Sequence, residues 1–93
     1  MSESRSEPVV WVAGVGAVAG LGAALARRFA REGLQVAVSG RSPDKLQAVV
    51  EGIRALGGEA VAIVADSGNE SEVIAASQQI SQLGPLKAAI FNV

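Results

Sequence analysis

Apolar residues along the chain gather in short runs separated by stretches of helical periodicity. Apolar-rich runs occupy residues 9–13, 35–39, 60–65 and 87–91, and these lengths are typical of strands. The first, Val-Val-Trp-Val-Ala, has no polar alternation, which predicts a central parallel strand buried on both faces. Residues 1–7 are polar and are expected to form a flexible tail, so the predicted domain spans residues 8–93.

The first two intervening segments carry helical patterns. In the segment from 21 to 32, large apolar residues recur at i, i+4 and i+8 and predict the buried stripe, with Gly33 ending the helix. The next helix begins with Ser42 as its cap and Pro43 in its first turn, and Gly57 stops it. The predicted buried stripes consist of Leu21, Leu25 and Phe29 in the first helix and Leu46, Val49, Val50, Ile53 and Leu56 in the second.

A third helix is predicted to follow residue 67. Ser67 and Glu70 have the spacing of a capping box, and Asn69 is a rival cap. Gly84-Pro85 breaks this helix before the last apolar run. Its predicted buried stripe is Val73, Ala76, Ile80 and Leu83.

The predicted order is β-α-β-α-β-α-β. Strands that alternate with helices favour right-handed crossovers and a parallel sheet. The sequence therefore predicts an α/β fold, a doubly wound Rossmann-type sheet with helices on both faces, of which this chain supplies four strands.

Composition narrows the function classes. A net charge of −1 with eight scattered basic residues argues against a nucleic-acid surface, and Arg27, Arg28 and Arg31 are expected to be a solvated helix face. No apolar run approaches the roughly 20 residues of a membrane span, and residues 1–7 are no secretory leader, so a soluble, cytoplasmic protein is expected. Cysteine and histidine are both absent, so no metal site is expected.

Residues 13–22, Ala-Gly-Val-Gly-Ala-Val-Ala-Gly-Leu-Gly, hold four of the eleven glycines between the first strand and the first helix. Strand, glycine loop and helix N-terminus together bind the phosphates of nucleotides. A P-loop is excluded, because Gly-Lys-Ser/Thr does not follow the glycines. The alternative is a tight turn in a protein that binds no nucleotide. The candidate cofactor-binding residues here are Gly14, Gly16, Gly20, Leu21 and Gly22.

Arg41 lies about twenty residues after the last of these glycines, where NAD-binding proteins place an acid on the ribose. The missing acid also counts against S-adenosylmethionine binding. A guanidinium at this position suits a 2′-phosphate, and Ser42 could add a hydroxyl. The predicted cofactor is therefore NADP, with a solvated surface arginine as the alternative.

These motifs resemble the N-terminal part of a short-chain dehydrogenase/reductase. Gly16, Gly20 and Gly22 match the glycine spacing of the family's Thr-Gly-x-x-x-Gly-x-Gly loop, and residues 40–46 resemble its NADP-type second turn. The resemblance implies further cofactor contacts. These are Asp66 against the adenine, backbone at Ser67, and Asn92 in place of an asparagine of the family's Asn-Asn-Ala-Gly segment.

The chain departs from the family pattern at two points. If Gly16 is the first loop glycine, Val15 replaces the threonine; if Gly14 is, the loop is two residues longer. Strand length favours Gly14 and spacing favours Gly16. Phe91 precedes Asn92, so the first asparagine of the Asn-Asn-Ala-Gly segment is lost.

The family's catalytic serine and Tyr-x-x-x-Lys pair lie beyond the fourth strand, and this chain contains no tyrosine. We therefore expect no catalytic residue in this chain. We expect the chain to be truncated after its fourth strand and to bind the dinucleotide of a larger oxidoreductase. The alternatives are a stand-alone nucleotide-binding module and a purely structural α/β fragment. The exposed far edge of the fourth strand, 88–91, predicts a homo-oligomer.

Overall fold

The computed structural model describes residues 7–16 and 20–92. Most of the predicted flexible tail, residues 1–6, lies outside the described residues. The predicted β-α-β-α-β-α-β order is confirmed. The elements are β1 (Val9–Ala13), α1 (Leu21–Arg31), β2 (Gln35–Gly40), α2 (Pro43–Ala55), β3 (Glu59–Val64), α3 (Glu70–Ser81) and β4 (Leu86–Phe91).

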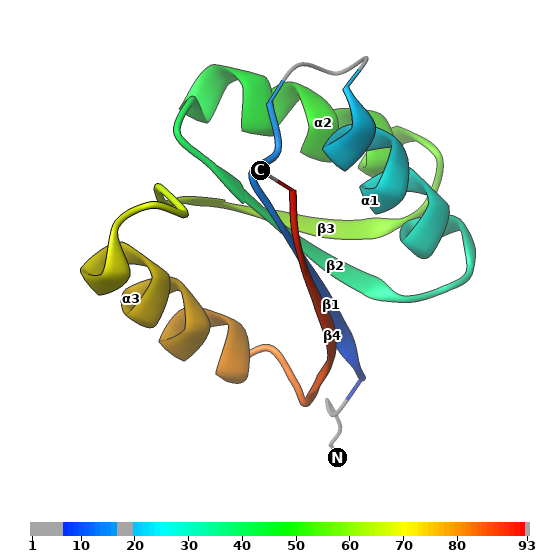
Figure 1. The fold of residues 1–93 in the computed structure, drawn as a ribbon. Helices are drawn as coiled ribbons and strands as arrows, with labels where there is room; N and C mark the ends of the chain where they lie inside the picture. Colours follow the sequence, from blue (N-terminus) through cyan, green and yellow to red (C-terminus); the bar gives the residue numbers. More distant parts are fainter. Residues whose placement is uncertain (1–6, 17–19, 93) are drawn as a thin grey trace.

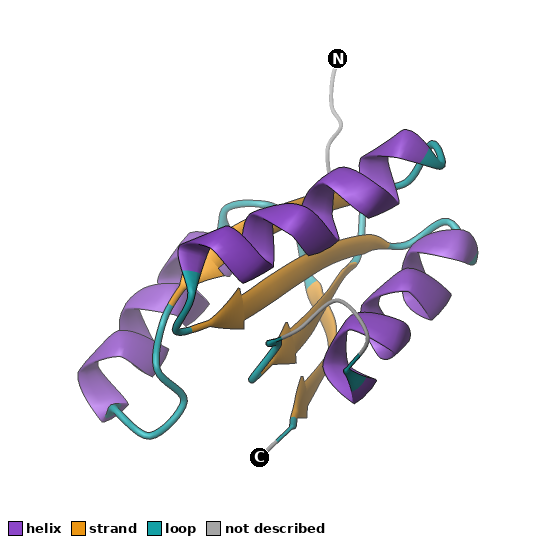
Figure 2. Cartoon of the chain, turned by 90° about the horizontal axis from the view of Figure 1, so that it is seen from above, coloured by secondary structure: helices purple, strands orange, loops and turns teal. Residues whose placement is uncertain are grey.

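The four strands form one parallel sheet in the order β3-β2-β1-β4, and their arrowheads point to the same end of the molecule (Figure 2). β1 pairs with β2 on one side and with β4 on the other, and all five of its residues are buried, as predicted. The chain moves outward from β1 to β3 and then returns to the opposite side of β1. This reversal between β1 and β4 is a topological switch point, where doubly wound folds bind ligands beyond the carboxyl ends of the strands.

Helices cover both faces of the sheet, as predicted for a doubly wound architecture. α1 and α2 lie on one face, and α3 lies on the other (Figure 1). Two separate apolar clusters hold these layers together. The larger cluster joins α1 and α2 to the sheet, and the smaller one joins α3 to it.

The buried stripe predicted for α1 is largely wrong, since of its three residues only Phe29 packs against the larger apolar cluster. Its buried residues are small ones, Gly22, Ala23, Ala26 and Ala30, whereas Leu21 is 66% exposed. Leu25 and Phe29 are only half-buried. Small side chains let a helix pack close to the strands, so the alanine face, rather than the face with the largest residues, lies against the sheet.

In α2 the predicted stripe is buried except at its end, where Leu56 is 83% exposed. Leu56 is the C-cap, since the helix ends at Ala55 and the chain reverses through Gly57 at φ +88°. The predicted Ser42 cap is confirmed, because its Oγ accepts a hydrogen bond from the Lys45 backbone N–H at 3.4 Å.

The predicted stripe of α3 is confirmed, with Ala76 and Ile80 fully buried. The N-cap of α3 is Asn69, the second of the two predicted candidates, and its Oδ1 accepts a hydrogen bond from the Glu72 backbone N–H at 3.1 Å. Ser67 is therefore not the cap, because the helix begins three residues later, at Glu70. Ser67 instead lies in the turn between β3 and α3, which frees it to face the end of the sheet.

Candidate functional site

A cleft of about 480 Å³ lies at the carboxyl ends of the strands, at the switch point of the sheet. We call it the carboxyl-end cleft. The turns after β1, β2, β3 and β4 all contribute to its wall, so residues far apart in the sequence meet there. Its lining consists of Gly14, Val15, Gly16, Gly40, Arg41, Ser42, Lys45, Ala65, Asp66, Ser67, Gly68 and Asn92.

The turn after β1 depends on Gly14. Its φ is +82°, and a Cβ there would collide with the backbone carbonyl oxygen of Asn92. A side chain is therefore excluded by both conformation and space. Gly16 also lines the cleft, but a Cβ there would meet nothing within 4 Å. The tight turn at the end of the strand thus belongs to Gly14.

The N-terminus of α1 carries the remaining predicted loop residues. Gly20 is the N-cap, with extended backbone and no side-chain hydrogen bond. A Cβ at Gly22 would come within 3.3 Å of the Asn92 amide nitrogen and of Val15, so glycine keeps this helix start close to the strand ends. Gly20, Leu21 and Gly22 do not line the cleft itself. Residues 17–19, between them and Gly16, lie outside the described residues.

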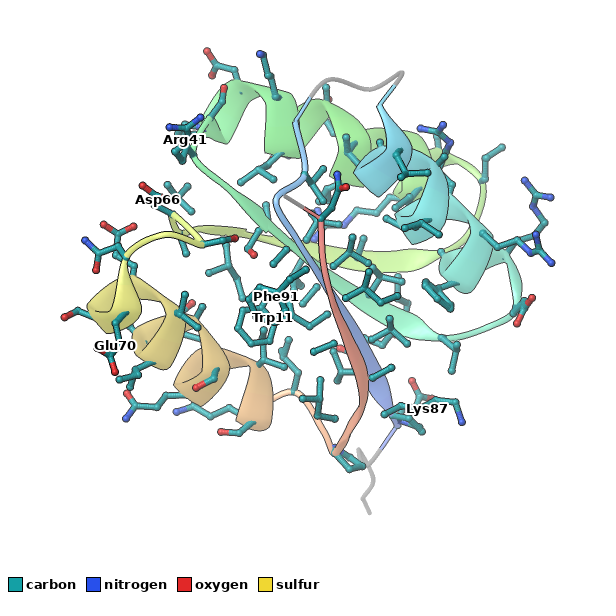
Figure 3. The ribbon with its side chains drawn as sticks, viewed as in Figure 1. Trp11, Arg41, Asp66, Glu70, Lys87 and Phe91 are labelled. Atoms are coloured by element: carbon teal, nitrogen blue, oxygen red, sulfur yellow. The ribbon has the colours of Figure 1, made fainter. Side chains whose placement is uncertain are left out.

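The wall formed by the end of β2 approaches the glycine turn closely. The Val15 N–H donates to the Ser39 carbonyl oxygen at 2.8 Å, and a Cβ at Gly40 would collide with the Val15 carbonyl oxygen. Arg41 follows at once and is exposed at the cleft, beside the half-buried Ser42. Figure 3 shows Arg41 and Asp66 at the same end of the molecule.

The wall formed by the turn after β3 is fixed by hydrogen bonds around Asp66. Its Oδ1 accepts from the Gly68 N–H at 2.9 Å, and its backbone N–H donates to Glu72 Oε1 at 2.8 Å. These bonds hold Asp66 and Ser67 at the cleft. Asn92, after β4, donates its backbone N–H to the Ala13 carbonyl oxygen at 2.9 Å.

Lys45 is a cleft residue that was not among the predicted cofactor contacts, although it belongs to the turn that resembles the family's NADP-type motif. The helical pattern of α2 placed it away from the buried stripe, and it is indeed exposed, but it lies in the first helical turn and lines the carboxyl-end cleft. Its spacing of four residues from Arg41 is the signal that could have found it, because the first turn of a helix brings such residues to the same end.

The cleft presents two cationic side chains, Arg41 and Lys45, and one carboxylate, Asp66. Within residues 7–16 and 20–92, neither cation forms a salt bridge. The same residues contain no cluster of carboxylates that could hold a metal ion, and none of their helices is long and apolar enough to cross a bilayer. The two cations at the cleft suit binding of an anionic ligand.

Comparison with known families gives a match over nearly the whole chain. The family described as short chain dehydrogenase matches residues 9–93. The human protein named dehydrogenase/reductase SDR family member 1 is 35% identical over 79 residues, which cover 83% of this chain and 25% of the human protein.

Solved structures agree with this match. The short-chain dehydrogenase/reductase from Serratia marcescens superposes with a TM-score of 0.84 at 33% identity, covering 95% of this chain and 36% of that one. The F189W actinorhodin polyketide ketoreductase with NADPH superposes with a TM-score of 0.82 at 28% identity, covering 98% and 34% of the two chains. The present chain thus spans about a quarter to a third of the length of these relatives.

Proposed function

Because the chain belongs to the short-chain dehydrogenase family, we propose that it forms the NADP(H)-binding portion of an oxidoreductase. The observation that carries this proposal is Arg41, which lines the carboxyl-end cleft at the end of β2. An acid at this position would bind the 2′-hydroxyl of NAD, whereas a guanidinium binds the 2′-phosphate of NADP.

The residues present fit a dinucleotide. Gly14 and Gly16 give backbone without side chains at the switch point. The N-terminus of α1 begins at Gly20, outside the cleft lining, and no side chain caps it, which leaves its first N–H groups as proposed donors to the pyrophosphate. Asp66 and Ser67 line the cleft in the turn after β3, which supports the proposal that they contact the adenine. The ketoreductase whose structure contains NADPH shares this fold, which supports the same class of ligand.

A bound NADP would supply the nicotinamide that accepts or donates hydride. This chain's own contribution is to bind and orient the dinucleotide at the strand ends. Its sequence contains no tyrosine, so no phenol is present to move the proton that accompanies hydride transfer. We therefore expect no turnover by the 93-residue chain alone, while carbonyl reduction is the proposed activity of a whole enzyme.

Titration of the chain with NADPH and NADH tests this function. We expect NADPH to bind more tightly. Arg41→Glu should lower NADPH affinity about 10- to 100-fold, the loss of charge-assisted hydrogen bonds, with little effect on NADH. Arg31→Glu is the matched control, because Arg31 is exposed at the far end of α1 and its charge change is the same. It should alter neither affinity.

Two results would contradict the proposal. If the chain binds NADPH and NADH with equal affinity, and Arg41→Glu changes neither affinity, NADP is not the preferred cofactor. Absence of saturable binding by either dinucleotide would favour the structural α/β fragment instead.

We also propose self-association through β4. This strand is the edge of the sheet, and its residues are exposed or half-buried, with Leu86 51% and Phe91 46% exposed. An apolar strand edge with unpaired backbone groups favours pairing with a second copy.

A further inference from the structure

We propose that Lys45 is a second cation for the 2′-phosphate and, with Arg41, determines the preference for NADP. This inference rests on the proposed function and gives a role to Lys45, a residue of the NADP-type turn that is not among the cofactor contacts predicted from the sequence. Both side chains line the carboxyl-end cleft. They reach it from the two sides of the α2 N-cap, Ser42.

The local structure explains why these cations are close. Ser42 accepts the Lys45 backbone N–H through its Oγ at 3.4 Å, so the turn from residue 42 to 45 is closed by its own cap. Pro43 occupies the first helical position, where its fixed φ favours the helical turn. Arg41 immediately precedes the cap and Lys45 completes the first turn, and both are therefore at the N-terminal end of α2.

Three features of the N-terminal end of α2 favour the binding of a phosphate. The N-terminus of a 13-residue helix adds partial positive charge to the two cations. Neither Arg41 nor Lys45 is paired with a carboxylate anywhere in the described part of the chain. Asp66, the carboxylate of the cleft, directs Oδ1 to the Gly68 N–H at 2.9 Å.

Arg41 and Lys45 would bind the phosphate in different ways, because their side chains differ. The planar guanidinium of Arg41 makes bidentate bonds to phosphate oxygens, whereas the ammonium of Lys45 acts as a point charge on a flexible stem. The 2′-phosphate carries nearly two negative charges near neutral pH, so a single cation would leave it incompletely neutralised. Lys45 supplies the second positive charge, which neutralises the rest of the phosphate charge.

The test compares two small probes that differ only in this phosphate. Adenosine 2′,5′-bisphosphate and adenosine 5′-monophosphate are each titrated calorimetrically into the wild-type chain, Lys45→Gln and Lys45→Arg. We expect Lys45→Gln to weaken the bisphosphate about 5- to 10-fold, which corresponds to about 1.0–1.4 kcal/mol for an exposed charge-assisted contact. The monophosphate should change less than about twofold, and Lys45→Arg should restore most of the bisphosphate affinity.

Lys87→Gln is the matched control. Lys87 is exposed on β4, at the end of the molecule opposite Arg41 (Figure 3), and its removal changes net charge by the same amount. It should leave both affinities unchanged, which separates a local contact from the general effect of net charge.

The possible failures are distinguishable. If the wild type prefers the bisphosphate and Lys45→Gln keeps that preference, the role of Lys45 is refuted and the proposed function stands. Equal weakening by Lys45→Gln and Lys87→Gln, or equal loss of both probes, also refutes it. If the wild type binds neither probe, the proposed function itself fails and the inference fails with it.

Discussion

Gly14 controls the shape of the carboxyl-end cleft at the scale of a single residue. It has a positive φ, and it lies where the ends of β1 and β4 meet, so that a Cβ would enter the carbonyl oxygen of Asn92. The absence of a side chain at this point keeps Asn92 and the turn after β1 in contact. Gly33, at φ +89°, shares the conformation but has open space around it.

This pair of glycines gives a stability prediction. Gly33→Ala should reduce the free energy of unfolding by about 1–2 kcal/mol, the cost of a left-handed conformation. Gly14→Ala should cost a further 1–3 kcal/mol or so, because the added methyl also collides with backbone. Urea denaturation followed by fluorescence measures both, since Trp11 is the one tryptophan of the sequence. Equal losses in the two variants would show that the contact with Asn92 is unimportant.

Arg41 and Ser42 were predicted from their position after a strand, whereas Asp66, Ser67 and Asn92 were implied by the family resemblance. All five line one cleft, because each lies in the turn after a strand and parallel strands end at the same edge. Lys45 could not be recognised in the same way. It lies inside a helix, where periodicity tells which residues avoid the core and not which of them border a cleft.

At the scale of elements, the turn between β3 and α3 fixes one wall of the site. Asn69 caps α3, and the same helix returns Glu72 to bind the backbone N–H of Asp66 at 2.8 Å. The cap and the cleft are thus connected through one side chain.

The cap makes a testable distinction between two neighbouring residues. Asn69→Ala should lower the free energy of unfolding by about 1 kcal/mol, the usual value of an N-cap. Ser67→Ala should change it by less than about 0.5 kcal/mol, because Ser67 caps no helix. Thermal unfolding followed by circular dichroism compares the two. A larger loss in Ser67→Ala would contradict the observed cap.

The positions of the helices could be predicted from the sequence, but the helix face that packs against the sheet was predicted correctly in α2 and not in α1. In α2 the buried stripe combines large size with helical spacing, and the prediction is confirmed up to Ile53. In α1 the fully buried residues are glycine and alanines, and of the predicted large residues only Phe29 packs against the same cluster. A periodicity argument that weights residues by size therefore selected the wrong stripe.

At the scale of the molecule, the two faces of the sheet are covered unequally. α1 and α2 cover one face, whereas α3 alone covers the other (Figure 1). Phe91 on β4 contacts Trp11 with ring centroids 5.1 Å apart, yet Phe91 remains 46% exposed. The apolar surface beside β4 is the region where the proposed second copy would bind.

Association through β4 should be sensitive to an added charge. Leu86→Lys places a cation on an exposed position of the edge strand, which should disfavour pairing with little effect on the fold. Light scattering over a range of concentrations should show a dimer or larger species for the wild type and a shift toward monomer for the variant. A wild type that is a monodisperse monomer at moderate concentration would contradict the proposed association.

The central claim is that the carboxyl-end cleft binds NADP, and mapping NADPH binding by amide NMR tests it most directly. Titration of the ¹⁵N-labelled chain should shift the amides of the turns that line the cleft, above all Gly14, Arg41 and Asp66. The amides of Leu56 and Lys87, which are outside that lining, should remain unchanged. Shifts centred elsewhere on the molecule, or no shifts at saturating NADPH, would contradict the account.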